Sequence, residues 1–239
     1  MSLSGGVQLF AHDVRSTSTT QDHPLGALGV TKDGRKYRYA KAGATALDPG
    51  KLTVNSTIVA NHENCAVASA AAVGVKSVTV TLGATLATED QYKGGFLVIN
   101  DAAGEGIAYA IKGHPAADSG ASLTVELEDP IAVALTTSSE ATLIANRFAG
   151  VVISAVDQAD TPAGVPNVAI AAGEYGWLQT GGLCSVLADE ILTVGKECTI
   201  GSSVTGALEL QDAVAEPVVA VAIQAGVDTE YRAVELVLD

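Results

Sequence analysis

The chain has 239 residues, 48% of them hydrophobic, and a formal net charge of −14 at pH 7. This length allows one large β domain or two smaller ones, and 25 Gly against three Phe and one Trp indicate thin, closely packed sheets rather than a wide ligand cavity. No run approaches the roughly 18 apolar residues of a membrane span, and the start MSLSGGVQLF lacks the regions of a signal peptide, so we expect no membrane association and a cytosolic origin.

The N-terminal segment differs in charge from the rest of the chain. Residues 1–51 carry seven Lys/Arg and four Asp/Glu, whereas the remainder carries six against 23. This asymmetry predicts a basic attachment segment, residues 1–50, on an acidic and solvated body. Residues 1–24 are rich in Ser, Thr, Gln and Asp without any periodicity, so we expect them to form an extended arm that has no core of its own.

The stretch LGALGVTKDGRKYRYA, residues 25–40, predicts a β-hairpin, because its Asp-Gly pair supplies the positive φ that tight turns require. Period-two alternation puts Tyr37 and Tyr39 on one face with Arg35, and two further cations on the other face. We expect this hairpin to bind a partner. The candidate residues are Lys32, Arg35, Lys36, Tyr37, Arg38, Tyr39 and Lys41.

The chemistry of that hairpin is compatible with more than one partner. Clustered cations beside tyrosines also suit nucleic acid. The acidic body would repel phosphates unless the hairpin projected beyond a Debye length of about 8 Å. We therefore expect an acidic protein surface and no nucleic acid, with an ordinary solvent-exposed hairpin as the alternative.

A β domain is expected at residues 51–147. KSVTVTL (76–82) and SLTVELE (122–128) alternate apolar and polar residues, which predicts half-buried strands. GGFLVIN (94–100) and EGIAYAIK (105–112) predict a second hairpin. The Ala-rich NCAVASAAAV (64–73) predicts a helix.

Beyond ANRFAG (145–150), short strand-like segments recur with Gly, Asp or Pro between them, which is typical of a closed β-barrel or sandwich. We expect this C-terminal domain at residues 148–239. The predicted fold class is thus mainly β, with sandwich or barrel modules, jelly rolls included, and an extended N-terminal arm. The C-terminal strand candidates are VVISAV, EYGWLQT, LCSVL, ILTV, ECTI, ALEL, PVVAVAI and YRAVELVL.

No residue pattern indicates catalysis or a cofactor. His62, Glu63 and Cys65 form the one grouping suited to a metal, but they match no known ligand spacing and a loop explains them as well. Nucleophile signatures are absent, and alternation turns the acidic pair Glu126 and Glu128 toward solvent. We therefore expect no enzyme, no metal and no cofactor.

Two other residue types have a structural and a functional interpretation. The three cysteines fit buried reduced thiols, with a disulfide between Cys184 and Cys198 as the alternative. Trp177, the sole tryptophan, fits the end of a barrel, with a sugar-stacking platform as the alternative.

Two stretches resemble segments of virion structural proteins of tailed bacteriophages, in particular capsid decoration or cement proteins. One is DGRKYRYAKAGATALDPGKL (33–52), and the other runs from GGFLVINDAAGEGIAYAIKGHPA (94–116) through SLTVELEDPI (122–131) to GEYGWLQTGG (173–182). The similarity covers most of the chain from about residue 25 and rests on turns and strands rather than on invariant chemical residues.

This resemblance implies a β-rich protein on the outer surface of a phage head, made in the host bacterial cytoplasm. Such a protein binds the major capsid protein, stabilises contacts between its copies, and forms a homo-oligomer, here with a trimer favoured over a dimer. The alternative is a host-receptor or carbohydrate-binding virion module, such as a head-fibre component, that uses Trp177 and Tyr175.

Overall fold

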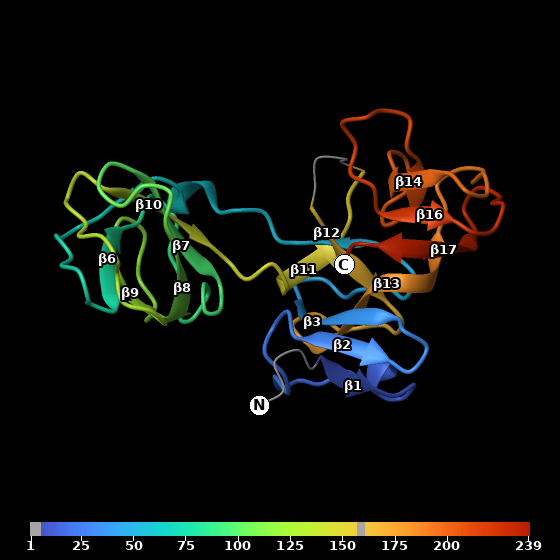
Figure 1. The fold of residues 1–239 in the computed structure, drawn as a ribbon, viewed down its shortest axis with the longest axis horizontal. Coiled ribbons are helices and arrows are strands. Elements are labelled where there is room, and N and C mark those ends of the chain that lie inside the picture. The colour runs from blue at the N-terminus through green and yellow to red at the C-terminus, as the bar shows by residue number, and fades with distance from the viewer. Residues whose placement is uncertain (1–5, 157–160) are drawn as a thin grey trace. The chain divides into compact units, whose positions relative to one another are not determined.

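The computed structural model describes residues 6–156 and 161–239 and confirms a mainly β fold (Figure 1). The chain divides into two compact units: unit 1 comprises residues 1–56 and 147–239, and unit 2 comprises residues 57–146. These limits differ from the predicted three segments, since the first fifty residues belong to the same unit as residues 148–239. No helix among the described residues is long and apolar enough to cross a membrane.

Unit 2 is a closed six-stranded barrel. Its strands are hydrogen-bonded in the order β5-β10-β7-β8-β9-β6. A bridge between Val67 and Val80 then joins the two ends of this sheet, so the sheet closes on itself. The strands are β5 (Cys65–Ala66), β6 (Ser77–Thr81), β7 (Phe96–Asp101), β8 (Ala108–Gly113), β9 (Ser122–Leu127) and β10 (Glu140–Ile144), and the 3-10 turn η2 (Ala60–His62) precedes them.

Alternating sequence positions build the core of this barrel. Val78 and Val80 of β6 and Leu123 and Val125 of β9 are at most 1% exposed, and the polar residues between them face outward. The predicted strands at 76–82 and 122–128 are confirmed, as is the hairpin formed by β7 and β8. Small apolar side chains on one face of each strand therefore suffice to fill the barrel.

The predicted helix at residues 64–73 is wrong. This segment forms β5 and a bridged extension, in which the Val67 N–H donates to the Ser139 carbonyl at 2.9 Å and the Ala68 N–H donates to the Thr79 carbonyl at 2.8 Å. These hydrogen bonds complete the barrel wall and bury Val67. Tertiary pairing thus overrides the helical propensity of alanine.

Unit 1 contains two adjoining barrel-like circuits. Its sheet follows the order β1-β2-β3-β11-β4-β12-β13-β17-β16-β14-β15, with an additional pairing of β3 with β13. That pairing closes β3, β11, β4, β12 and β13 into a ring. The strands are β1 (Val7–Leu9), β2 (Leu28–Thr31), β3 (Lys36–Ala42), β4 (Thr53–Val54), β11 (Ala149–Ile153), β12 (Pro162–Pro166), β13 (Tyr175–Leu187), β14 (Glu197–Ile200), β15 (Leu208–Leu210), β16 (Ala220–Ala222) and β17 (Tyr231–Val237).

The long strand β13 belongs to both circuits. Its first part, from Tyr175 to Gly181, pairs with β3, and its second part, from Gly181 to Leu187, pairs with β17. A parallel bridge between Ala188 and Leu208 brings the chain after β13 to β15, which closes the second circuit. Separate buried clusters fill the two circuits, one around Leu47 and Leu178 and the other around Val186 and Val234.

Two further sequence expectations for unit 1 need correction. The extended arm, predicted to lack a core of its own, packs on its own chain: β1 runs parallel to β2, and Leu9 and Val14 are 2% and 3% exposed, because they cover the tyrosine face of β3. Residues 1–5 lie outside the described part of the chain. The predicted strand ILTV at residues 191–194 is a loop that buries only Leu192.

Candidate partner-binding surface

The predicted hairpin is present as β2 and β3. The Gly34 N–H donates to the Thr31 carbonyl at 2.9 Å, and the Thr31 N–H donates to the Arg35 carbonyl at 3.0 Å. Gly34 has a φ of +86°, which is the conformation that its Asp-Gly sequence predicted. The structure therefore confirms the predicted hairpin turn. What the hairpin can bind depends on where its side chains lie.

Tyr37 and Tyr39, predicted to contact a partner, are only 0% and 3% exposed. β3 lies between β2 and β13, and the N-terminal segment covers the face that carries both rings. Tyr39 packs edge-on against Trp177, with ring centroids 5.1 Å apart. Both tyrosines thus stabilise the chain's own core, and the expectation that they bury area against a partner is corrected.

Most of the predicted cations contact groups of their own chain. Arg38 forms an ion pair with Asp239 at 2.8 Å, and Lys36 Nζ donates to the Asp239 carbonyl oxygen at 3.1 Å. Arg35 Nε pairs with Asp33 at 2.9 Å, and Lys41 Nζ lies 5.4 Å from the ring centroid of Tyr175. Among the predicted residues, the exposed Lys32 has no ion pair within the described part of the chain.

A hollow beside the hairpin tip presents an aromatic side chain that the sequence analysis missed. It has a volume of about 440 Å³, and its lining comprises Leu9, Phe10, Ala11, Thr31, Lys32, Asp33 and Arg35. Phe10 is 63% exposed. Its backbone N–H donates to Asp13 Oδ2 at 2.7 Å, which fixes the turn that presents the ring. The signal for Phe10 is the short, mainly apolar segment VQLF (7–10), which falls within the predicted extended arm.

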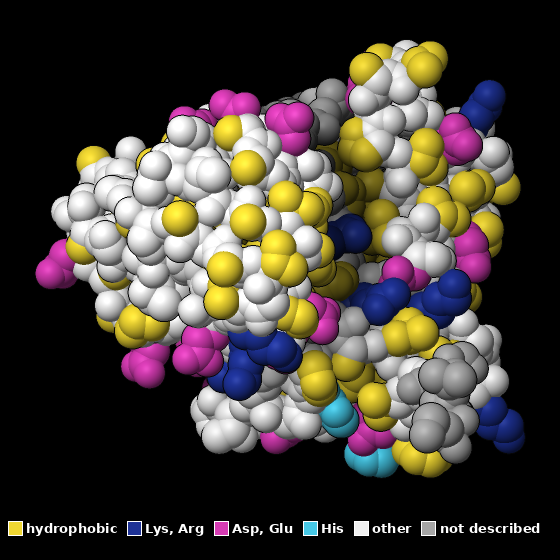
Figure 2. Space-filling view, turned by 60° about the vertical axis from the view of Figure 1, so that its left-hand side comes forward, with side chains coloured by type: hydrophobic (Ala, Val, Ile, Leu, Met, Phe, Trp, Pro, Cys, Tyr) yellow, Lys and Arg dark blue, Asp and Glu magenta, His cyan; other side chains and the backbone are white. Residues whose placement is uncertain are grey.

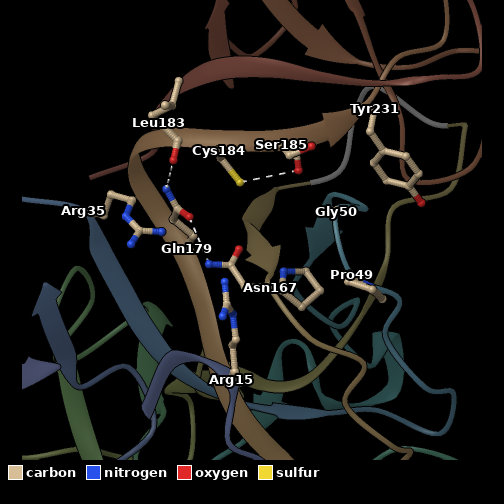
Figure 3. Close-up of a pocket in the computed structure, with 11 residues that line it drawn as sticks. Arg15, Arg35, Pro49, Gly50, Asn167, Gln179, Leu183, Cys184, Ser185 and Tyr231 are labelled. Carbon is tan, nitrogen blue, oxygen red and sulfur yellow. Dashed lines mark hydrogen bonds between the residues drawn. The ribbon is translucent and has the colours of Figure 1, made fainter. Parts of the chain in front are cut away.

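A second cavity, of about 340 Å³, lies where β13 changes its partner strand (Figure 3). Arg15, at the end of the 3-10 turn η1 (Asp13–Arg15), and Arg35 both line it. Gln179, on its wall, is 1% exposed, and its Nε2 donates to the Leu183 carbonyl at 2.9 Å. The rest of the lining comprises Pro49, Gly50, Pro166, Asn167, Leu183, Cys184, Ser185 and Tyr231.

A third cavity, also of about 340 Å³, is aromatic. Tyr39, Tyr175 and Trp177 line it together with the carboxylates of Asp13 and Asp22. Trp177 is 4% exposed, because its ring packs in the core. Of these three rings, the half-buried Tyr175 therefore exposes the most surface to a ligand.

The sequence motif NHENC has a structural role. His62 is fully buried, with Nε2 3.0 Å from the Thr85 carbonyl oxygen and Nδ1 hydrogen-bonded to the Tyr92 hydroxyl. Glu63 is exposed, and Cys65 belongs to the barrel core. Within residues 6–156 and 161–239, no group of three or more His, Cys, Asp or Glu side chains is arranged to hold a metal ion.

The three cysteines are free and buried, so the alternative disulfide between Cys184 and Cys198 does not form. Burial raises the pKa of the Cys184 thiol to about 12 and that of the Cys198 thiol to about 11. Both groups are neutral thiols at physiological pH and hence poor nucleophiles.

Basic side chains on the molecular surface occur in small groups. Figure 2 shows this for one face, where acidic and hydrophobic side chains lie beside them. Comparisons with models of protein families, with curated proteins and with solved structures find no match to this chain. The residues of the chain itself therefore carry the functional conclusion.

Proposed function

We propose that the chain is a non-enzymatic structural protein of a phage virion, which binds the outer surface of the head and stabilises contacts between major capsid proteins. The observation that carries this proposal is the hollow beside the hairpin tip, with Phe10 63% exposed and Lys32 and Arg35 at its edge. An exposed aromatic ring with cations beside it, on a chain of net charge −14, suits an acidic protein surface that offers an apolar pocket.

The binding free energies of the two kinds of contact favour an aromatic anchor over ion pairs alone. An exposed ion pair contributes about 1 kcal/mol or less, whereas full burial of a phenylalanine side chain contributes roughly 1.5–3 kcal/mol. Neither suffices for a stable clamp. Repetition of the contact around a homo-oligomer, a trimer in preference to a dimer, would multiply these small terms.

A clamp of this kind stabilises the form of the shell to which it binds best. Binding to the expanded shell and not to the burst shell would shift the equilibrium toward the expanded one, by an amount that grows with the protein's concentration over its dissociation constant. The two units also suit bridging, because each has a hydrophobic core of its own and could contact a different capsid subunit.

The test is to add purified protein to capsids that lack it, and to measure both co-sedimentation and the temperature at which DNA escapes. We expect binding and a higher release temperature with the unaltered chain. Phe10→Ser should lose most of the binding. Phe96→Ser is the matched control, because Phe96 is 47% exposed on the barrel of unit 2. Equal loss with both variants, or no binding of the unaltered chain, would contradict the proposal.

A second candidate function is carbohydrate binding by a virion module, and the aromatic cavity favours it. Aromatic rings that stack on a sugar face, with carboxylates that accept hydrogen bonds from its hydroxyls, are a suitable lining for such a ligand. Binding on a glycan array that is lost with Tyr175→Ala and retained with Tyr231→Ala would support it. No binding to any glycan on the array would exclude carbohydrate binding and leave the structural role.

A further inference from the structure

We propose that the cavity lined by Arg15 and Arg35 binds a ligand that carries a carboxylate. This inference does not rest on the virion function, although Arg35 also lines the hollow around Phe10. Its basis is the lining itself: two guanidinium groups occur among eleven lining residues, and none of the eleven is Asp or Glu. The chain has 27 acidic residues, yet none of them lines this cavity. The two arginines therefore provide donors for an external anion.

The arginines differ in what already contacts them. Arg35 Nε pairs with Asp33 Oδ2 at 2.9 Å, which neutralises part of its charge but leaves its two terminal nitrogens without a described partner. Arg15 has no side-chain hydrogen bond or ion pair within the part of the chain that the structure describes. Figure 3 shows its guanidinium pointing toward the side chain of Asn167. Arg15 is therefore the main donor for a ligand.

A polar network fixes Asn167 and Gln179 in the cavity wall beside Arg15. Asn167 Nδ2 donates to the Tyr37 hydroxyl at 3.0 Å and lies 3.3 Å from Gln179 Oε1. Gln179 Nε2 is in turn bonded to the carbonyls of Gly181, Gly182 and Leu183. Because every member of this network is bonded, the cavity wall is fixed before a ligand arrives, which lowers the entropic cost of binding.

The remaining wall carries no charge and is partly apolar. Cys184 contributes a thiol that its high pKa keeps uncharged at physiological pH, so it does not compete with a ligand for the arginines. The Tyr231 ring packs directly on Gly50, where an added Cβ would lie only 2.6 Å from Cε1. Pro49 and Pro166 add rigid apolar surface. Such a wall fits the hydrocarbon part of a small organic acid.

The size of the cavity limits the ligand. At about 340 Å³ it falls near the lower end of the range for small-molecule sites, roughly 300–1,000 Å³. The planar fork of arginine can bind a carboxylate through two parallel hydrogen bonds. The small volume favours such a group over an extended chain of phosphates. Two sources supply this chemistry: the side chain of a Glu in a protein partner, and a free dicarboxylate of similar length.

The experiment uses the full-length chain at about 20 mM salt, with glutarate and an acetylated, amidated tripeptide that contains one Glu as probes. Calorimetric titration measures affinity, and the side-chain amide signals of Asn167 report the location by NMR. We expect one ligand per chain and a shift of the Asn167 signals. Tighter binding of the peptide would identify a protein partner as the source, and tighter binding of glutarate would identify a metabolite. The matching Gln tripeptide should not bind.

Two variants distinguish binding at this cavity from nonspecific electrostatic attraction to the protein. Arg15→Gln should weaken binding at least tenfold with little change in melting temperature, since Arg15 has no described partner. Lys32→Gln removes an exposed cation outside the lining and should change affinity less than twofold. Equal effects of the two substitutions, unmoved Asn167 signals, or no binding of either probe would each overturn the proposal.

Discussion

The guanidinium of Arg38 forms a bidentate ion pair with the carboxylate of Asp239, with Nε 2.8 Å from Oδ2 and Nη2 2.9 Å from Oδ1. Thr180 Oγ1 also donates to Oδ2, at 2.7 Å. Burial acts to raise the pKa of Asp239, but the hydrogen bonds from Arg38 and Thr180 outweigh it, so the pKa lies below its ordinary value. The Arg38–Asp239 contact joins residues 201 positions apart in the sequence, and the Thr180–Asp239 contact joins residues 59 positions apart.

Asp239→Asn should lower the free energy of unfolding by about 1 kcal/mol at pH 7, since both side chains are less than one third exposed. The folded-state pKa is lowered, so the stabilisation is present above the unfolded-state pKa of about 4 and is lost as pH falls through the folded value. Urea unfolding from pH 7 to pH 3 should therefore show the variant and the unaltered protein converging at the acid end.

The control for this substitution is Asp48→Asn, which breaks the more exposed ion pair with Lys51 at 2.9 Å. It should cost less at pH 7. A loss as large as that of Asp239→Asn would show that the variants report general charge effects rather than the geometry of the Arg38 pair.

Gly50→Ala should destabilise unit 1 more than Gly173→Ala. The two glycines have nearly the same backbone conformation, with φ of +73° and +75°, so each substitution carries a similar backbone cost of about 1 kcal/mol. Only Gly50 is crowded: its added Cβ would lie 2.6 Å from Tyr231 Cε1, whereas Gly173 has no neighbour within 4 Å. We expect about 1 kcal/mol of additional loss in thermal unfolding, which Tyr231→Ala in the same chain should relieve.

Tyr92→Phe should cost about 1–3 kcal/mol, because it removes the hydrogen-bond partner of a fully buried histidine nitrogen. His62 Nε2 faces a carbonyl oxygen and so carries the proton, which leaves Nδ1 to accept from the Tyr92 hydroxyl. Burial raises the pKa of Tyr92 to about 12, so the hydroxyl remains a donor at neutral pH. Denaturant unfolding measures the loss. Tyr109→Phe should lose less, because within the described residues the Tyr109 hydroxyl accepts from the N–H of Ala132, which is exposed.

The thiols should react with a maleimide only after unfolding. All three are buried, and burial raises the pKa values of Cys184 and Cys198 to about 12 and about 11. Mass spectrometry should count no rapid modification of the native protein at pH 7, and three modifications in urea without reductant. A count of one in urea would instead reveal the Cys184–Cys198 disulfide.

An excised fragment 57–146 should fold and unfold cooperatively, because the barrel of unit 2 closes on itself around its own core. A fragment 148–239, the domain that the sequence predicted, should not, since it lacks β3 and β4 and leaves the first ring of unit 1 open. Circular dichroism and thermal melting of both fragments compare the two boundary schemes directly.

The sequence predicted those elements whose signal is local. Residues 77–81 and 122–127 alternate strictly, and their strands pair with each other as half-buried strands should. The turn at Gly34 follows from one dipeptide. The segment 64–73 failed because alanine is small enough for either structure, and the decisive contacts, with Thr79 and Ser139, come from elsewhere in the chain.

The candidate site was harder to predict because its residues meet only through pairing of distant strands. Alternation placed Tyr37 and Tyr39 on one face, but it could not show that Leu9, Val14 and Trp177 cover that face. Composition likewise did not reveal that Arg38 is already paired with Asp239. The cavity at Arg15 and Gln179 combines residues more than 160 positions apart, and no local pattern links them.

Because β13 belongs to both circuits of unit 1, neither circuit can close during translation until β13 has been synthesised. β3 emerges early in translation, yet its partner, residues 175–181, is synthesised more than 130 positions later. The inserted barrel, residues 57–146, is complete well before then. The nascent chain would therefore carry one finished barrel while the edge of β3 that later pairs with β11 and β13 stays open. A chaperone that shields this edge during the interval would raise the yield of native protein.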